Sequence, residues 1–118
     1  MNKFDALFNA TCEKLGKNPM KFNAWLTFLN SNKMRMLNLR TRGIDKSTDV
    51  LSFPVEMRID SGITELGDIV ICKRIARRNK ISVPFLYVHG LLHLLGYDHL
   101  NETDEVMMNN LTEEILDE

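Results

Sequence analysis

The three histidines of this chain all fall within residues 89–99. On an α-helix, residues four positions apart lie one above the other, so His89 and His93 can chelate one ion. Gly96 follows where such a helix would end, because glycine adopts the left-handed conformation that terminates helices at little steric cost. The chain can then turn His99 towards the same ion. The spacing therefore predicts a metal bound by three imidazoles.

Three neutral nitrogen ligands are typical of zinc, although nickel, cobalt or manganese can also bind such a set. A tetrahedral ion with three protein ligands keeps a fourth position for water, which indicates a catalytic metal. Cys72 is an alternative fourth ligand that would close the site. Because it ends an apolar stretch, we favour a role as a small core residue. We therefore expect one Zn²⁺ per chain with an open position.

The histidine spacing equals that of the zinc-protease motif H-E-x-x-H-x-x-G-x-x-H, with one difference. Gly90 stands where those proteases carry the glutamate that moves a proton from the metal-bound water to the leaving amine. Peptide hydrolysis is therefore not expected. A metal can still polarise a phosphoryl oxygen, and RNA carries its own 2′-hydroxyl nucleophile. Asp98 is a candidate base or, as we favour, orients a ligand imidazole through a hydrogen bond.

Length and composition favour one domain, which we expect to span residues 1–118. With 44% hydrophobic residues the chain can bury a core without disulfides. Cys12 and Cys72 are interpreted as free thiols. No secretory leader and no apolar run long enough to span a membrane is recognised, so we expect a cytoplasmic protein.

The net charge of −1 hides a division along the chain. Residues 1–100 carry 15 Lys and Arg against 9 Asp and Glu, a net charge of +6, while residues 101–118 carry seven acids and no base. The positive part suits a polyanion, and ordinary solvated charge is an equally weighted alternative. The most basic segment contains Lys73, Arg74, Arg77 and Arg78.

Local patterns predict the elements that position these residues. Apolar residues at helical spacing predict a helix over residues 4–15, and alternating aromatic residues predict a strand over 22–29. Ser31 or Asn32 can cap a second helix that ends near Gly43. The residues expected to face inward from this helix are Met34, Leu37 and Leu39.

Residues 50–55 and 69–72 are predicted as strands that can pair in a hairpin, with one more short extended piece between them as the alternative. Pro54 either keeps the first of them at a sheet edge or ends it, and Gly67 with Asp68 is interpreted as the turn before the second. After the histidine helix a last helix is expected, capped near Asn101. It is predicted to pack through Val106, Leu111 and Ile115. We expect an α+β fold with a small mixed sheet of about four strands, packed helices, and a metal site on a helix and the following loop.

Three blocks of sequence together resemble the YbeY endoribonucleases, which are bacterial ribosomal-RNA maturation factors. The blocks occur in the family's order and the resemblance covers residues 22–100. Residues 42–54 read Arg-Gly-Ile-Asp-Lys-Ser-Thr-Asp-Val-Leu-Ser-Phe-Pro, residues 66–69 read Leu-Gly-Asp-Ile, and residues 89–99 read His-Gly-Leu-Leu-His-Leu-Leu-Gly-Tyr-Asp-His.

The resemblance implies a metal-dependent endoribonuclease that prefers single strands. It further implies a role in 3′-end maturation of small-subunit ribosomal RNA and in ribosome quality control, with ribosomal RNA and the small subunit as partners. The family's functional arginine corresponds to Arg42, and its zinc ligands correspond to His89, His93 and His99. RNA-binding candidates are Arg42, Lys73, Arg74, Arg77 and Arg78.

Two other interpretations remain open from the sequence. One is a metallohydrolase with a substrate other than RNA, against which the missing glutamate counts. The other is a non-enzymatic ribosome assembly factor with a structural metal, for which Cys72 would be the fourth ligand.

Overall fold

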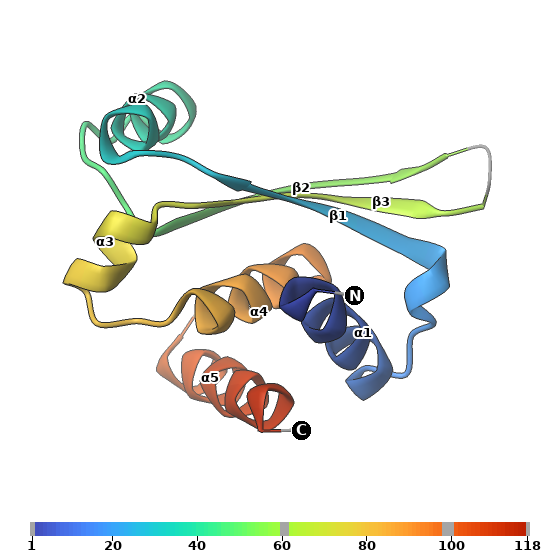
Figure 1. The fold of residues 1–118 in the computed structure, drawn as a ribbon. Coiled ribbons are helices and arrows are strands. Elements are labelled where there is room, and N and C mark those ends of the chain that lie inside the picture. The colour runs from blue at the N-terminus through green and yellow to red at the C-terminus, as the bar shows by residue number, and fades with distance from the viewer. Residues whose placement is uncertain (1, 60–61, 98–100, 118) are drawn as a thin grey trace.

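A sheet of three strands lies at the centre of the computed structural model, which describes residues 2–59, 62–97 and 101–117 (Figure 1). Strand β3 (Thr64–Ile71) lies between β1 (Phe22–Phe28) and β2 (Val50–Arg58). It pairs in parallel with β1 and antiparallel with β2. The predicted α+β class with a mixed sheet is confirmed. Within the described ranges the sheet has three strands, where the sequence suggests about four.

Helices cover the sheet unequally. The helical segments are α1 (Lys3–Lys14), η1 (Pro19–Lys21), α2 (Ser31–Arg42), α3 (Lys73–Arg78), α4 (Val83–Leu94) and α5 (Glu102–Leu116). Helices α1, α4 and α5 lie on one face of the sheet, with α4 between the sheet and α5, while α2 lies on the opposite face near one end (Figure 1). Of the helices in the described residues, none is long and apolar enough to cross a lipid bilayer.

Helix α4 is the centre of the hydrophobic core. The residues of α4 are apolar on almost all sides of the helix, which is the pattern of a helix covered on several sides. Its Val88, Leu91 and Leu92 are fully buried in one cluster with Ile69 of β3 and Met108 of α5. Because α4 also carries two of the three histidines, this packing holds their backbone in place between the sheet and α5.

The predicted hairpin is confirmed as β2 and β3, and both strands are longer than expected. Pro54 lies in β2, which is an edge strand, as its missing N–H requires. The turn predicted at Gly67 and Asp68 is wrong, because both residues lie inside β3. There Gly67 is paired with Pro54, next to an irregularity in the pairing of the two strands. A glycine inside a strand can mark such an irregularity, and the local sequence does not distinguish this glycine from one in a turn.

Gly67 is expected to tolerate no side chain. Its φ is +132°, and a Cβ atom would lie 2.1 Å from the carbonyl oxygen of Phe53 on the neighbouring strand. We expect Gly67→Ala to lower the free energy of unfolding by more than about 2 kcal/mol, since both strands would have to move apart. Chemical denaturation measures this change.

A matched control for this substitution is Gly16→Ala. Gly16 also has a positive φ, of +70°, but a Cβ atom added to it would have no neighbour within 4 Å. Backbone strain alone should then cost roughly 1 kcal/mol. Equal losses in the two variants would show that the close approach of β2 is unimportant.

Helix α2 begins and packs slightly differently from the prediction. Its cap is Asn30, whose Oδ1 accepts a hydrogen bond from the Lys33 N–H at 2.9 Å, one residue before the predicted cap positions. Met34 is fully buried as expected, whereas Leu39 is 47% exposed. Asn38, four residues after Met34, lies on the buried side instead, because residues at that spacing share a helix face.

Helix α5 begins at the predicted cap. The Oδ1 of Asn101 accepts a hydrogen bond from the Asp104 N–H at 2.9 Å. Ile115 is buried as predicted, but Val106 is 52% exposed. The buried face runs through Met108 and Ile115, and Val106 lies off this face.

Candidate metal centre

A cleft of about 1290 Å³ runs along α4. Besides α4 itself, it is lined by residues of β2, of the end of α2, of the α3–α4 connection and of α5. Typical small-molecule pockets have volumes of roughly 300–1,000 Å³. The cleft is larger than that range.

His89 and His93 lie side by side in this cleft. Both are half-buried, and their ring centroids are 5.1 Å apart with the ring planes at 77°. The Phe85 ring stacks on His89 with a centroid distance of 5.8 Å and an interplanar angle of 14°. The spacing of four residues thus brings the two imidazoles next to each other on α4. A metal bound between them stays a prediction.

A capping serine and a glycine bend set the two ends of α4, the helix that carries both histidines. Ser82 caps it through a hydrogen bond from the Phe85 N–H to Oγ at 3.2 Å. The helix ends at Leu94, and Gly96 has a φ of +102°, as the prediction of a glycine bend requires. His99 and Asp98 lie outside the described residues, so the third predicted ligand and its neighbour remain predictions. In the part of the chain that is described, no group of three His, Cys, Asp or Glu could hold a metal ion.

Gly90 lies against the sheet rather than in open space. A Cβ atom at this position would lie 3.0 Å from Ile69 Cγ2 and 3.1 Å from Ser52 Oγ. A side chain at position 90 would therefore crowd Ile69 and Ser52, which would have to shift by a few tenths of an ångström. The close packing of α4 on the sheet thus leaves little room for a side chain at position 90.

Cys72 does not lie in the cleft. It is fully buried in a cluster with Met34, Leu51 and Val70, between α2 and the sheet. Both cysteines are buried free thiols, as predicted. Burial raises the pKa of Cys12 to about 11, so that thiol stays protonated at neutral pH. The placement of Cys72 argues against the alternative of a closed, sulfur-ligated site.

Arg42 is the last residue of α2 and lines the same cleft as the two histidines. The helix ends there because Gly43 adopts the left-handed conformation, with a φ of +72°. Among the described residues Arg42 makes no ion pair, so its guanidinium is available to an anion. The structure thus brings Arg42 and the histidine pair, 47 residues apart in sequence, to one surface.

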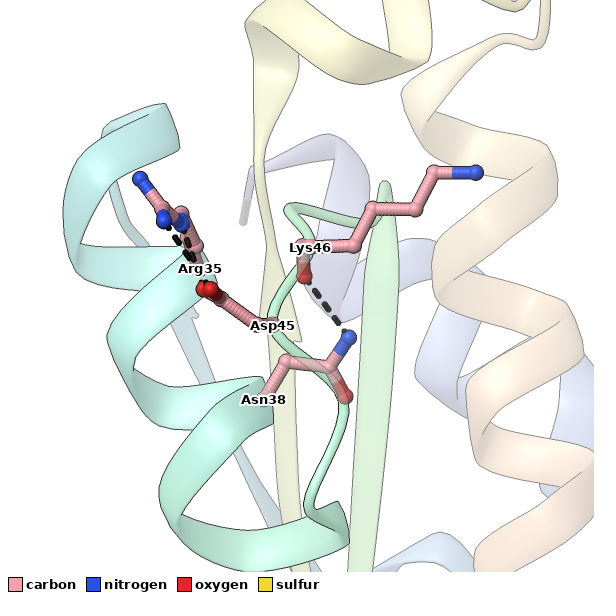
Figure 2. A network of polar contacts seen from close by, with 4 residues as sticks. All are labelled: Arg35, Asn38, Asp45 and Lys46. Carbon is pink, nitrogen blue, oxygen red and sulfur yellow. Dashed lines mark hydrogen bonds and ion pairs between the residues drawn. The ribbon is translucent and has the colours of Figure 1, made fainter.

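Two contacts hold the loop after Arg42 against α2 (Figure 2). Arg35 donates to Asp45 through Nε at 2.6 Å and Nη2 at 3.1 Å, and Asn38 Nδ2 donates to the Lys46 carbonyl oxygen at 2.8 Å. The Arg35 guanidinium lowers the pKa of Asp45, mainly through this hydrogen bond. Because the loop leads directly into β2, these contacts set the position of the end of α2 relative to the cleft.

The basic residues of α3 lie outside the cleft. All four are exposed, and none is among the residues that line it. The Nζ of Lys73 lies 4.3 Å from the centroid of the Phe28 ring. These residues, Lys73, Arg74, Arg77 and Arg78, therefore form a separate basic surface, which we call the α3 surface.

Sequence reasoning missed several residues of the cleft. Glu105, Asn109 and Glu113 on α5 face it, so part of the acidic tail lies beside the candidate metal site. Their spacing of four residues places them on one helix face, but spacing alone does not tell what that face contacts. Tyr97 is 41% exposed and lines the cleft. Lys80 lines it as well.

The fold and the cleft define an α+β protein with a candidate metal centre. Residues 1–118 match the family model described as Endoribonuclease YbeY. This chain therefore belongs to the endoribonuclease YbeY family.

Similar proteins agree with this assignment. An Endoribonuclease YbeY of Wolbachia pipientis from Culex pipiens is 40% identical over 118 residues, which covers 93% of this chain and 76% of the relative. The Endoribonuclease YbeY of Desulforamulus reducens is 43% identical over 105 residues, which covers 78% of this chain and 69% of the relative. The solution structure of TM1509 from Thermotoga maritima has a TM-score of 0.58 at 23% identity and covers 97% of this chain and 79% of that one. That likeness shows a shared fold.

Proposed function

We propose that this chain is a metal-dependent endoribonuclease that cleaves single-stranded RNA. The observation that carries the proposal is the adjacent pair His89 and His93 in a large cleft, in a chain of a family named for endoribonuclease activity. The Arg42 guanidinium at the same cleft supports a substrate with a negative charge.

The metal would be held by His89, His93 and the third predicted ligand, His99. Zn²⁺ suits three imidazoles, and other divalent transition metals suit the same donors. When bound, such an ion supplies hydroxide near neutral pH and polarises a phosphoryl oxygen. Gly90 allows α4 to approach β2 closely, and both histidines line the same cleft as residues of β2.

Two further residues, Arg42 and Asp98, are proposed to contribute to catalysis. Arg42 donates guanidinium N–H groups to a phosphate and offsets the charge that develops in the transition state. We propose that Asp98 would accept a hydrogen bond from a ring N–H of a ligand imidazole and so orient it, with action as the base as the alternative.

The proposed biological substrate is ribosomal RNA. We propose that the protein acts in the cytoplasm on the small ribosomal subunit, in 3′-end maturation of its RNA and in ribosome quality control. The family resemblance supports these partners, and the exposed cations of the α3 surface suit a ribose-phosphate backbone.

Metal analysis combined with a defined single-stranded RNA assay at several salt concentrations tests the function. We expect about one metal ion per chain, loss of cleavage with a chelator, and recovery on adding the metal. If three phosphates are contacted, affinity should fall roughly twentyfold between about 50 and 200 mM salt, because each contact releases about 0.7 counterion. Cleavage that persists unchanged in the chelator would contradict the proposal.

A further inference from the structure

Lys80 holds an unusual backbone conformation. Its φ is +59°, and among the described residues it is the one non-glycine residue with a positive φ. It follows Asn79, the C-cap of α3, at a position where helices most often carry glycine. A side chain there is strained, because its Cβ atom lies too close to the following carbonyl oxygen. Strained residues of this kind are concentrated at functional sites.

The surrounding hydrogen bonds determine this conformation. The Lys80 N–H donates to the Arg77 carbonyl at 3.1 Å, and the Ile81 N–H donates to the Ala76 carbonyl at 3.0 Å. These bonds close the end of α3 and require a left-handed residue between them. Asn79 Nδ2 also donates to Asp49 Oδ2 at 3.1 Å, which ties the end of α3 to the segment before β2. The turn therefore has a fixed place at the edge of the cleft.

The charges that line the cleft make Lys80 important for an anionic substrate. Among the described lining residues the cations are Arg42 and Lys80, while the carboxylates are Asp49, Glu105 and Glu113. Without Lys80, a single arginine would oppose three carboxylates. As with Arg42, no ion pair of Lys80 occurs in the described residues, so its ammonium is available.

Lys80 closely follows the helix that carries the α3 surface. The exposed residues Arg77 and Arg78 end the helix that leads directly into the Lys80 turn. The two glutamates belong to α5, whereas both lining cations come from the α2 and α3 ends of the cleft. Phosphates are attracted to cations and repelled by carboxylates, so Arg42 and Lys80 are the groups of the described lining that would hold a backbone entering the cleft.

We propose that Lys80 binds an RNA phosphate, in addition to the one at Arg42, and guides a single strand from the α3 surface into the cleft. This proposal rests on the proposed function. It explains why a lysine occupies a position where glycine would be more stable. Lys80 is then a substrate-binding residue selected at a cost in stability.

Salt-dependent binding of a fluorescein-labelled single-stranded oligoribonucleotide to the metal-loaded protein tests this. Lys80→Gly should weaken binding roughly eightfold at about 50 mM salt and reduce the slope of log K against log salt by about 0.7, the loss of one phosphate contact. Its Tm should be no lower than that of the wild type, because glycine relieves the positive φ. Lys80→Arg should keep the wild-type slope.

Lys21→Ala is the matched control, since Lys21 is exposed on η1 and does not line the cleft. It should leave both affinity and slope unchanged. Wild-type affinity and slope in Lys80→Gly would overturn the assignment of Lys80 while leaving the nuclease proposal intact. If instead the wild type itself fails to bind RNA, the proposed function fails and this inference fails with it.

Discussion

His93→Ala is expected to lose the bound metal and to cleave single-stranded RNA more than about a hundredfold more slowly than the wild type. Even residues that only orient metal ligands change affinity or activity by about 10- to 100-fold, and His93 is a proposed ligand itself. The ring centroids of His93 and His89 are 5.1 Å apart. The substitution therefore removes one of these two adjacent imidazoles. Metal content per chain and initial cleavage rates measure the two effects.

The control for this variant is Met107→Ala. Met107 is 64% exposed on α5 and does not line the cleft, so metal content and cleavage should both remain at wild-type levels. Thermal denaturation shows whether each variant is folded. A folded His93→Ala protein with a full complement of metal would exclude His93 as a ligand.

Arg42→Ala is expected to keep the metal and the fold but to cleave RNA about 10²- to 10³-fold more slowly. This is the range observed when one preorganised hydrogen-bond donor to a developing negative charge is removed. Arg42 is exposed at the end of α2 and makes no ion pair in the described residues, so little stability should be lost. Arg42→Lys should recover only part of the rate, since an ammonium cannot make the bidentate contact.

Arg40→Ala separates this role from a general effect of charge. Arg40 lies in the same last turn of α2, is exposed and does not line the cleft. Its loss should change cleavage by less than about threefold, as expected for a screened surface charge. Equal activity in the wild type, His93→Ala and Arg42→Ala would point to a contaminating nuclease and end the enzyme proposal.

Elements with a strong local pattern were predictable from the sequence. The first helix, the strand at residues 22–29, the β2–β3 hairpin and the cap at Asn101 all depend on periodicity or on capping residues within a few positions. The same is true of the His89 and His93 pair, because a spacing of four on a helix brings two side chains together whatever the rest of the fold.

Where one local pattern fits two structures, the sequence did not show which of them forms. Gly67 could mark a turn or a close approach of two strands, and only the pairing with β2 shows that it is the second. Leu39 and Val106 are apolar but exposed, since the buried face of each helix is set by the partner against which it packs. The parallel pairing of β1 with β3 likewise joins strands far apart in the chain.

By itself the sequence determined the imidazole pair, its helix and the glycine bend that follows, because these depend on local geometry. The tertiary structure alone decided that Arg42, Lys80 and the α5 glutamates share the cleft with this pair. Their positions depend on the packing of α4 between the sheet and α5 and on the ends of α2 and α3. Residues far apart in the sequence come together only when the helices and strands pack against one another. The spacing of residues along the sequence does not contain that information.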